Sequence, residues 1–302
     1  MAEAFNPPER VGFVGLGQMG APMARNLAKA GFALALLDAR PGIAAGLGLD
    51  AALPADLAGV GAACRVAITM LPDGRIVRDA VLGERGLAST LARGSVIIDM
   101  SSSSPVGTQQ LGRDLAARGI ALIDAPVSGG VKRAVDGSLA IMAGGDGAVI
   151  ERCRPILAAM GKQIFATGPL GSGHAMKALN NYVSAAGLVA AAEAMLAGSR
   201  FGLAPETIVG ILNASTGRNN STEIKFPQFI LPRNFTSGFS LGLMVKDLRT
   251  ALDVAHATNT PAPVAETVVE AWAEAEKLLG GQADHTAVVQ YWEALIEGKD
   301  RA

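Results

Sequence analysis

The chain has 302 residues, half of them hydrophobic, and its 26 basic residues nearly balance 27 acidic ones. This length predicts about two domains, and the balanced charge argues against a nucleic-acid-binding surface or a charged tail. Cys64 and Cys153 form neither a disulfide framework nor a metal-like cluster, and the start "MAEAFNPPER" lacks the features of a signal peptide. The most apolar later stretch, "AAGLVAAAEAMLAG", is shorter than the ~20 residues that span a bilayer. We therefore expect a soluble cytoplasmic protein with neither membrane nor nucleic acid as a partner.

Short apolar runs of strand-forming residues recur through the first half of the chain. They are "VGFVGLG", "ALALLDA", "VAITMLP", "SVIIDMS", "IALIDAPV", "LAIMAGG" and "KQIFATG". Helix-like segments at 18–30, 104–118 and 147–160 separate several of them. Near-continuous apolar strands that alternate with helices indicate a parallel sheet covered on both faces. The pattern predicts an α/β domain with a doubly wound, Rossmann-type sheet over residues 1–170.

From Ser172 onward, helical patterns replace the strand runs. The composition changes near "ATGPLGSG", which marks the expected domain boundary. Residues 171–302 are therefore expected to form an all-α domain, and Asp284 is a suitable N-cap for its last helix. The expected helices cover roughly 172–200, 205–214, 240–259, 263–280 and 285–296.

The first predicted strand ends in a glycine-rich turn. Gly15, Gly17 and Gly20 form the pattern G-x-G-x-x-G between a strand and a helix. In dinucleotide-binding folds the first glycine allows the tight turn, the second lets the backbone approach the pyrophosphate, and the third lets helix and strand pack closely. The helix N-terminus then offers its N–H groups to the phosphates. The residues expected to bind the cofactor here are Gly15, Leu16, Gly17, Gln18, Met19 and Gly20.

The end of the second predicted strand bears on the choice of cofactor. Asp38 stands there, at the distance from the glycine motif that is typical of NAD-binding folds. An acid at this place accepts hydrogen bonds from the ribose hydroxyls of NAD and repels the 2′-phosphate of NADP. Arg40 follows closely and is of the type that pairs with that phosphate. The sequence favours NAD and leaves NADP open.

Two further loops are expected at the carboxyl edge of the sheet, where doubly wound folds bind ligands. They are "MLPDG" (70–74) and "DMSSSSP" (99–105). Ser103 or Ser104, placed before Pro105, is equally suited to cap the next helix. The residues of these loops that we expect at the cofactor are Met70, Leu71, Pro72 and Ser102.

Four sequence blocks together resemble those of the β-hydroxyacid dehydrogenases, which include 3-hydroxyisobutyrate dehydrogenase and tartronate semialdehyde reductase. The blocks are "GFVGLGQMGAPMARNL", "DAPVSGG" (124–130), "GSGHAMKALNN" (171–181) and "MVKDL" (244–248), in the family's order along nearly the whole chain. The resemblance implies an N-terminal Rossmann-type domain, a long interdomain helix, and an all-α domain that binds substrate and helps to form homodimers or homotetramers.

The resemblance also implies roles for particular residues. Lys177 would be catalytic and Asn181 its substrate-binding partner. The substrate carboxylate would lie at Ser128, Gly129 and Gly130. Lys246 would border both the nicotinamide and the substrate, and the adjacent Asp247 is interpreted as structural.

Lys177 suits proton transfer on physical grounds as well. Oxidising an alcohol with NAD requires a hydride acceptor, which the cofactor supplies, and a group that takes the hydroxyl proton. A lysine serves as that base when desolvation or a nearby cation lowers its pKa from about 10.4 towards neutrality. Its neighbours Ala175, Met176, Ala178 and Leu179 are apolar. Asn181, four residues on, projects from the same helix face, although by spacing alone such a pair is also common on helix surfaces.

The turn at 127–130 and the histidines complete the candidate set. Ser128, Gly129 and Gly130 offer a hydroxyl and unobstructed backbone N–H groups that suit a carboxylate, or they simply end a strand. His174 is interpreted as a packing or pocket-lining residue, because no partner for a triad or metal site is visible for it or for His285. No metal is expected.

The favoured function is an NAD-dependent oxidoreductase that acts in either direction on a small 3-hydroxy acid. An NADPH-dependent semialdehyde or glyoxylate reductase on the same scaffold is the alternative. Imine reductases usually replace the catalytic lysine, so Lys177 argues against that activity. A non-catalytic nucleotide-binding module would need neither Lys177 nor the carboxylate turn. The group on C2 of the substrate is left open.

Overall fold

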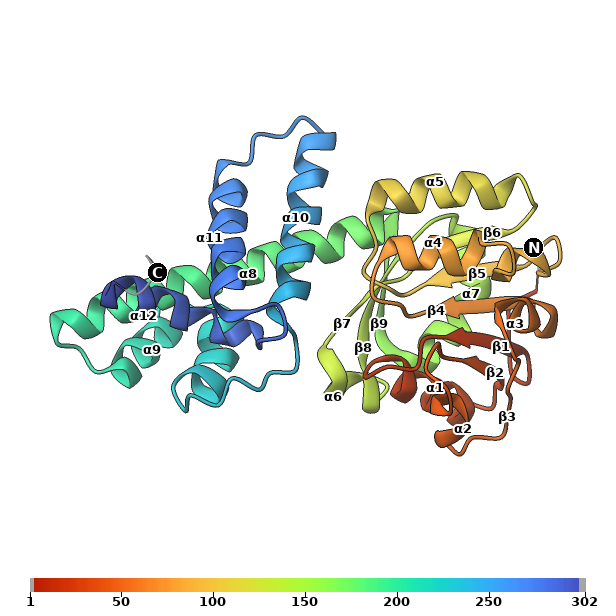
Figure 1. The fold of residues 1–302 in the computed structure, drawn as a ribbon, viewed down its shortest axis with the longest axis horizontal. Helices are drawn as coiled ribbons and strands as arrows, with labels where there is room; N and C mark the ends of the chain where they lie inside the picture. Colours follow the sequence, from red (N-terminus) through yellow and green to blue (C-terminus); the bar gives the residue numbers. More distant parts are fainter. Residues whose placement is uncertain (1–2, 299–302) are drawn as a thin grey trace. The chain divides into compact units, whose positions relative to one another are not determined.

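The computed structural model describes residues 3–298, and the chain divides into two compact units, Met1–Lys177 and Ala178–Ala302 (Figure 1). Each unit has its own hydrophobic core. The division falls within helix α8 (Ser172–Phe201), which is 30 residues long. The long helix implied by the family resemblance is therefore present.

The first unit is built on a nine-stranded, mostly parallel sheet. Its strands are β1 (Arg10–Val14), β2 (Ala33–Leu37), β3 (Ala51–Ala52), β4 (Val66–Thr69), β5 (Val96–Asp99), β6 (Ala121–Asp124), β7 (Val127–Ser128), β8 (Leu139–Gly144) and β9 (Gly161–Gly168). They lie in the order β3-β2-β1-β4-β5-β6-β8-β7, and β9 pairs with β8. The chain reverses its direction of travel between β1 and β4, which is the switch point where doubly wound sheets bind ligands. The expected Rossmann-type sheet is confirmed.

Helices cover both faces of this sheet (Figure 1). They are α1 (Gly20–Lys29), α2 (Ile43–Gly46), α3 (Leu57–Ala63), α4 (Gly74–Leu82), α5 (Pro105–Ala116), α6 (Gly130–Val135) and α7 (Gly147–Met160), with a 3₁₀ turn at Leu87–Ser89. Within β5, Val96 and Ile98 face the core that includes Met23 of α1, whereas Ile97 faces the core that includes Val77 of α4. Burial of both faces explains why the strands are continuous apolar runs rather than alternating ones.

All seven apolar runs of the first half form strands, and the structure adds elements that the sequence pattern does not predict. Strands β3 and β7 have only two residues each, too few for a periodic signal. Helices α3 and α4 are short, but each has an aspartate N-cap. Asp56 accepts a hydrogen bond from the N–H of Gly59, and Asp73 accepts one from Ile76. These caps explain how such short segments remain helical.

The second unit is all-helical, as the sequence predicts. Besides α8 it contains α9 (Pro205–Ala214), the π-helix η2 (Ser221–Ile230), α10 (Leu241–Ala257), α11 (Pro263–Leu279), the 3₁₀ turn η3 (His285–Val288) and α12 (Val289–Glu297). Its core surrounds the fully buried Trp272. Asp284 caps η3 and accepts the N–H of Thr286. The last helix expected over 285–296 is divided, because α12 begins at Val289 with Val288 in the N-cap position. The π-helix is unexpected, since Pro227 within it argues against a regular helix.

Helix α8 is long and apolar enough to cross a membrane by length and composition, with a mean hydropathy of 1.3 over its best window, of which 33% is buried. The apolar run considered in the sequence is only part of this helix. Leu188, Ala192 and Met195 of α8 belong to the core of the second unit. The part of α8 from Ala178 onward is therefore a core helix of the second unit.

Candidate functional site

The glycine-rich turn between β1 and α1 lies at the switch point of the sheet. Gly15 has a φ of +96°, and a Cβ there would clash with the Met70 carbonyl oxygen. A Cβ at Gly20 would clash with the Gly15 carbonyl oxygen. A Cβ at Gly17, by contrast, would meet no atom of the described residues within 4 Å. The outer glycines are required by packing, whereas Gly17 borders open space at the start of α1, which fits the approach of a pyrophosphate.

Asp38 connects this turn to the end of β2. Its Oδ2 accepts the backbone N–H of Leu16 at 2.7 Å. Its Oδ1 accepts the backbone N–H and the Nε–H of Arg40, both at 2.9 Å. Burial alone would raise the pKa of Asp38, but the hydrogen bonds from Arg40 and Leu16 offset this and hold its pKa below the usual value. The two residues that the sequence sets against each other in cofactor choice thus form an ion pair.

The loops after β4 and β5 meet at this same edge. Leu71 donates its backbone N–H to Ser101 Oγ at 2.9 Å. Met70 and Leu71 both border Gly15, so the structure brings these two predicted residues to the glycine turn. Pro72 and Ser102 lie in the same two loops.

The capping hydrogen bond expected from Ser103 or Ser104 at the start of α5 is not the one that the structure shows. Ser104 occupies the N-cap position of α5, but its side chain makes no capping hydrogen bond. Ser103 Oγ instead donates to Asp99 Oδ2 at 2.7 Å. The expected capping bond is therefore not made by Ser104, and the Ser103 hydroxyl binds the buried carboxylate of Asp99. Pro105 at the first helical position still favours the start of α5.

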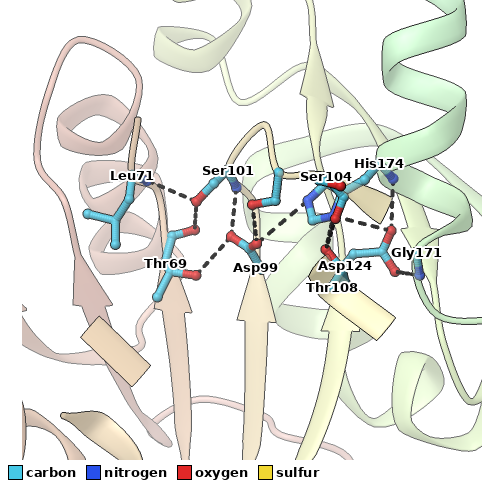
Figure 2. Close-up of polar contacts among 10 residues, drawn as sticks. Thr69, Leu71, Asp99, Ser101, Ser104, Thr108, Asp124, Gly171 and His174 are labelled. Atoms are coloured by element: carbon cyan, nitrogen blue, oxygen red, sulfur yellow. Dashed lines mark hydrogen bonds and ion pairs between the residues drawn. The ribbon is translucent and has the colours of Figure 1, made fainter. Parts of the chain in front are cut away.

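Asp99 is the centre of a buried polar network at the ends of the central strands (Figure 2). Its side chain is 1% exposed. Oδ1 accepts hydrogen bonds from Thr69 Oγ1 at 2.9 Å and from the N–H of Ser101 at 3.0 Å. These bonds hold the carboxyl ends of β4 and β5 together.

His174 joins this network from the first turn of α8. Its Nδ1 lies 2.8 Å from Thr108 Oγ1, and its Nε2 lies 3.7 Å from Asp99 Oδ2. Nδ1 is also 3.8 Å from Asp124 Oδ2. His174 is thus a buried packing residue, as predicted, and its polar neighbours come from elements far away along the chain. Within residues 3–298, no group of three or more histidine, cysteine or acidic residues is placed to hold a metal ion.

Lys177 follows His174 by one turn on α8. Its side chain is half-buried, between the exposed Met176 and the buried Ala178. Asn181 is one further turn along the helix and is 8% exposed. The i, i+4 spacing places the lysine and the amide on one helix face, as the sequence predicts.

Asp247 of α10 fixes the orientation of Asn181. Asn181 Nδ2 donates to Asp247 Oδ2 at 2.7 Å. Asp247 is 2% exposed, and Lys246 Nζ lies 3.6 Å from its Oδ1. A carboxylate only accepts, so the amide must present its NH₂ to Asp247 and its oxygen to other donors. The interpretation of Asp247 as a structural residue does not include this role, because nothing in the sequence of α10 indicates Asn181 as its partner.

Ser128, Gly129 and Gly130 form the turn from β7 into α6, with Ser128 ending the strand and Gly130 beginning the helix. Gly129 and Gly130 have φ values of +127° and +67°, which disfavour other residues. A Cβ at Gly129 would clash with the side chain of Arg133, whereas a Cβ at Gly130 would meet no described atom within 4 Å. The open space expected over this turn therefore lies at Gly130, and Arg133 packs over Gly129.

Comparison with known proteins agrees with this geometry. Residues 10–168 match the family described as the NAD binding domain of 6-phosphogluconate dehydrogenase. Residues 171–292 match the family described as the NAD-binding region of NADP-dependent 3-hydroxyisobutyrate dehydrogenase.

Individual relatives cover nearly the whole chain. A 2-(hydroxymethyl)glutarate dehydrogenase from Eubacterium barkeri is 37% identical over 95% of this chain and 95% of its own length. A 2-hydroxy-3-oxopropionate reductase from Escherichia coli is 36% identical over 96% of this chain and 99% of its own. The structure of a Mycobacterium tuberculosis 3-hydroxyisobutyrate dehydrogenase with L-serine has a TM-score of 0.87 and 32% identity, and the match covers 95% of this chain and 99% of that one. The chain therefore belongs to the β-hydroxyacid dehydrogenase family of NAD(P)-dependent oxidoreductases.

Proposed function

We propose that this protein transfers a hydride between NAD and a small 3-hydroxy acid, or the corresponding semialdehyde, with Lys177 as the general acid and base. The observation that carries this proposal is the presence in one chain of the open glycine turn at Gly17 and the Lys177–Asn181 pair on α8. The relatives act as a dehydrogenase and as a reductase by name, which supports a reaction that runs in either direction.

The roles of the side chains follow from their chemistry. Lys177 takes the proton of the substrate hydroxyl during oxidation and returns it during reduction. Asn181 donates its NH₂ to Asp247, and its oxygen accepts a hydrogen bond from Asn180 Nδ2 at 3.3 Å. The second lone pair of that oxygen accepts a hydrogen bond from the Lys177 ammonium or the substrate hydroxyl. Lys246, beside Asp247, adds positive charge next to this amide. When bound, NAD supplies the hydride acceptor.

The carboxylate of the substrate is assigned to the turn at Ser128, Gly129 and Gly130. Successive backbone N–H groups in left-handed conformations form a concavity that suits an anion. The positive φ values of both glycines and the open space at Gly130 support this role.

NAD is the proposed cofactor because the pKa of Asp38 is held below its usual value, and an ionised acid at the end of the second strand suits the ribose hydroxyls of NAD and repels a 2′-phosphate. An NADPH-dependent semialdehyde or glyoxylate reductase is the second candidate. One observation favours it: the Arg40 side chain is 62% exposed and would be able to exchange its partner Asp38 for a 2′-phosphate.

A substrate panel tests the proposed function directly. The purified protein would be assayed with 3-hydroxyisobutyrate, L-serine, 2-(hydroxymethyl)glutarate and glycerate, and with tartronate semialdehyde in the reverse direction, using NAD(H) and NADP(H) in parallel. We expect turnover with at least one 3-hydroxy acid and a preference for NAD. Tight NAD binding without turnover of any compound would instead indicate a non-catalytic nucleotide-binding module.

We also propose that the chain forms a homodimer or homotetramer through its second unit. Val183 and Phe201 of α8 have 67% and 88% of their surface exposed in the single chain, and large exposed apolar side chains favour a partner surface. Light scattering coupled to size-exclusion chromatography would measure the mass, and a monomer at micromolar concentration would contradict the proposal.

A reducing cytoplasm is the proposed location. Burial raises the pKa of Cys64 to about 11 and that of Cys153 to about 12, so both thiols are protonated and unreactive. Neither residue forms a disulfide. Fractionation of cells that express the protein would test this location, which a membrane-bound pool would contradict.

A further inference from the structure

Asp124, the last residue of β6, lies against the first turn of α8 (Figure 2). Its Oδ1 accepts the N–H of Gly171 at 2.7 Å, and its Oδ2 accepts the N–H of His174 at 2.8 Å. Asp124 has no exposed surface, so water does not compete for these bonds. One carboxylate thus satisfies two N–H groups at the start of the helix and places negative charge at the positive end of its dipole.

Two glycines allow this close approach. A Cβ at Gly173 would clash with the Met142 carbonyl oxygen and lie 2.9 Å from Asp124 Oδ2. A Cβ at Gly144 would lie 2.6 Å from Asp124 Oδ1. Because backbone and carboxylate are in direct contact on both sides, the first turn of α8 has little freedom to move relative to β6 and β8.

The His174 side chain makes a second set of contacts that hold the first turn of α8. Its Nδ1 contacts Thr108 Oγ1 of α5 at 2.8 Å, and Thr108 Oγ1 is also 3.0 Å from the Ser104 carbonyl oxygen. The ring lies between the carboxylates of Asp99 and Asp124. Three elements of the sheet unit therefore hold the turn that precedes Lys177.

We infer that Asp124, supported by the His174–Thr108 contact, is a positioning residue that fixes Lys177 relative to the carboxylate-binding turn. The turn proposed to bind the substrate carboxylate and the proposed catalytic lysine are both close along the chain to residues that this side chain holds. Ser128 lies a few residues after Asp124. Lys177 lies one helical turn after His174, whose backbone N–H donates to Asp124. The inference rests on the proposed role of Lys177. Asp124 touches neither the substrate nor the cofactor in this scheme and acts through the placement of α8.

The variant Asp124→Asn tests this role. Its amide would direct an NH₂ group at a backbone N–H that now donates to a carboxylate oxygen, so one bond is lost and two donors face each other. We expect kcat to fall by about 10- to 100-fold, since a displacement of about 1 Å in a reacting group can cost on the order of 10²-fold. The affinity for NAD should not change, because the glycine turn at Gly15 to Gly20 lies elsewhere.

A double-mutant cycle separates positioning from general damage. If Asp124 acts through Lys177, then Asp124→Asn will cost no further turnover in the Lys177→Ala background. The matched control is Asp146→Asn, because Asp146 accepts the N–H groups of Ala148 and Val149 at the start of α7. We expect this control to leave turnover unchanged in both backgrounds. An equal loss from Asp124→Asn with and without Lys177 would overturn the inference.

Amide hydrogen exchange gives a second reading that does not depend on activity. Exchange at residues 171–177 should accelerate in Asp124→Asn and not in Asp146→Asn. Unchanged exchange, or faster exchange with wild-type kcat, would refute the positioning role. If Asp124→Asn does not fold, Thr108→Val removes the contact between Thr108 and His174 and leaves Asp124 unchanged. We expect this variant to lose less kcat, and to lose none in the Lys177→Ala background. Absence of turnover in the unaltered protein would refute the proposed function instead. The exchange result would still show whether Asp124 holds the first turn of α8.

Discussion

Asn181 and Asp247 form a buried hydrogen bond of 2.7 Å between Nδ2 and Oδ2, and this bond decides which end of the amide faces outward. Without the carboxylate, only the longer hydrogen bond of 3.3 Å from Asn180 Nδ2 to Asn181 Oδ1 would oppose a rotation of the amide by half a turn. Asp247 therefore matters to the site through Asn181.

We expect Asp247→Ala to lower kcat/KM by about tenfold or more, since hydrogen bonds to charged groups contribute about 1.5–3 kcal/mol. Asp247→Asn keeps an acceptor oxygen and should lose less. Steady-state kinetics of both variants, with NAD binding as the control, would check this. Equal activity of Asp247→Ala and the unaltered protein would show that the orientation of Asn181 is unimportant.

Lys177→Ala should abolish most turnover while leaving NAD binding nearly intact. Loss of a general acid and base costs about 10²–10⁴-fold in rate. Lys162→Ala is the matched control, because Lys162 is an exposed lysine on β9. Turnover at saturating substrate and cofactor binding would be measured for both. Near-normal turnover of Lys177→Ala would show that Lys177 is not the general acid and base.

Asp38→Ser should shift the cofactor preference from NAD towards NADP. The substitution removes the repulsion of the 2′-phosphate and frees Arg40 from its ion pair. It also removes the acceptor of the Leu16 N–H, so we expect NAD affinity to fall as well. The measurement is the ratio of kcat/KM with NAD to kcat/KM with NADP. Arg40→Ala is the control, which should shift the preference in the opposite direction. A preference for NADP in the unaltered protein would show that Arg40 outweighs Asp38.

Gly129→Val should raise KM and lower kcat for the 3-hydroxy acid. The new side chain conflicts with Arg133 and with the φ of +127°, so the turn that holds the carboxylate must shift. Gly130→Ala adds a Cβ into open space at a φ of +67° and should have a smaller effect. A substrate amide in place of the acid should lose most of its kcat/KM. Equal activity on acid and amide would disprove the carboxylate site.

Acid should destabilise the fold through His285. Burial, and then the charge of Lys225, lower the pKa of His285 from 6.5 to about 4. Above pH 6.5 the ring is neutral in both states, whereas between pH 6.5 and about 4 only the unfolded chain gains the proton. Stability is therefore lost as the pH falls through this window, by on the order of 3 kcal/mol in total.

The variant His285→Gln should lose less of its thermal stability than the unaltered protein between about pH 7 and about pH 4.5. His256→Gln is the control, because His256 is exposed. Identical acid dependence in all three proteins would assign the loss to the carboxyl groups. His285 Nδ1 lies 3.0 Å from Ser237 Oγ and 3.1 Å from the Phe239 carbonyl oxygen, neighbours that the sequence pattern does not indicate.

Features that depend on near neighbours along the chain could be predicted from the amino-acid sequence. The seven long strand runs, the glycine turn at Gly15 to Gly20, the helical second half and the Lys177–Asn181 spacing all follow from local periodicity and turn chemistry. The aspartate cap at Asp284 is of the same kind.

Which polar groups meet could not be predicted, because it depends on how the whole chain folds. Asp124 contacts His174, and Asn181 contacts Asp247, across long stretches of sequence. Periodicity states which face of an element a residue occupies, but it does not state which other element will cover that face. The partners of a buried carboxylate are set by the order of the strands and the packing of the helices, and these depend on the whole chain.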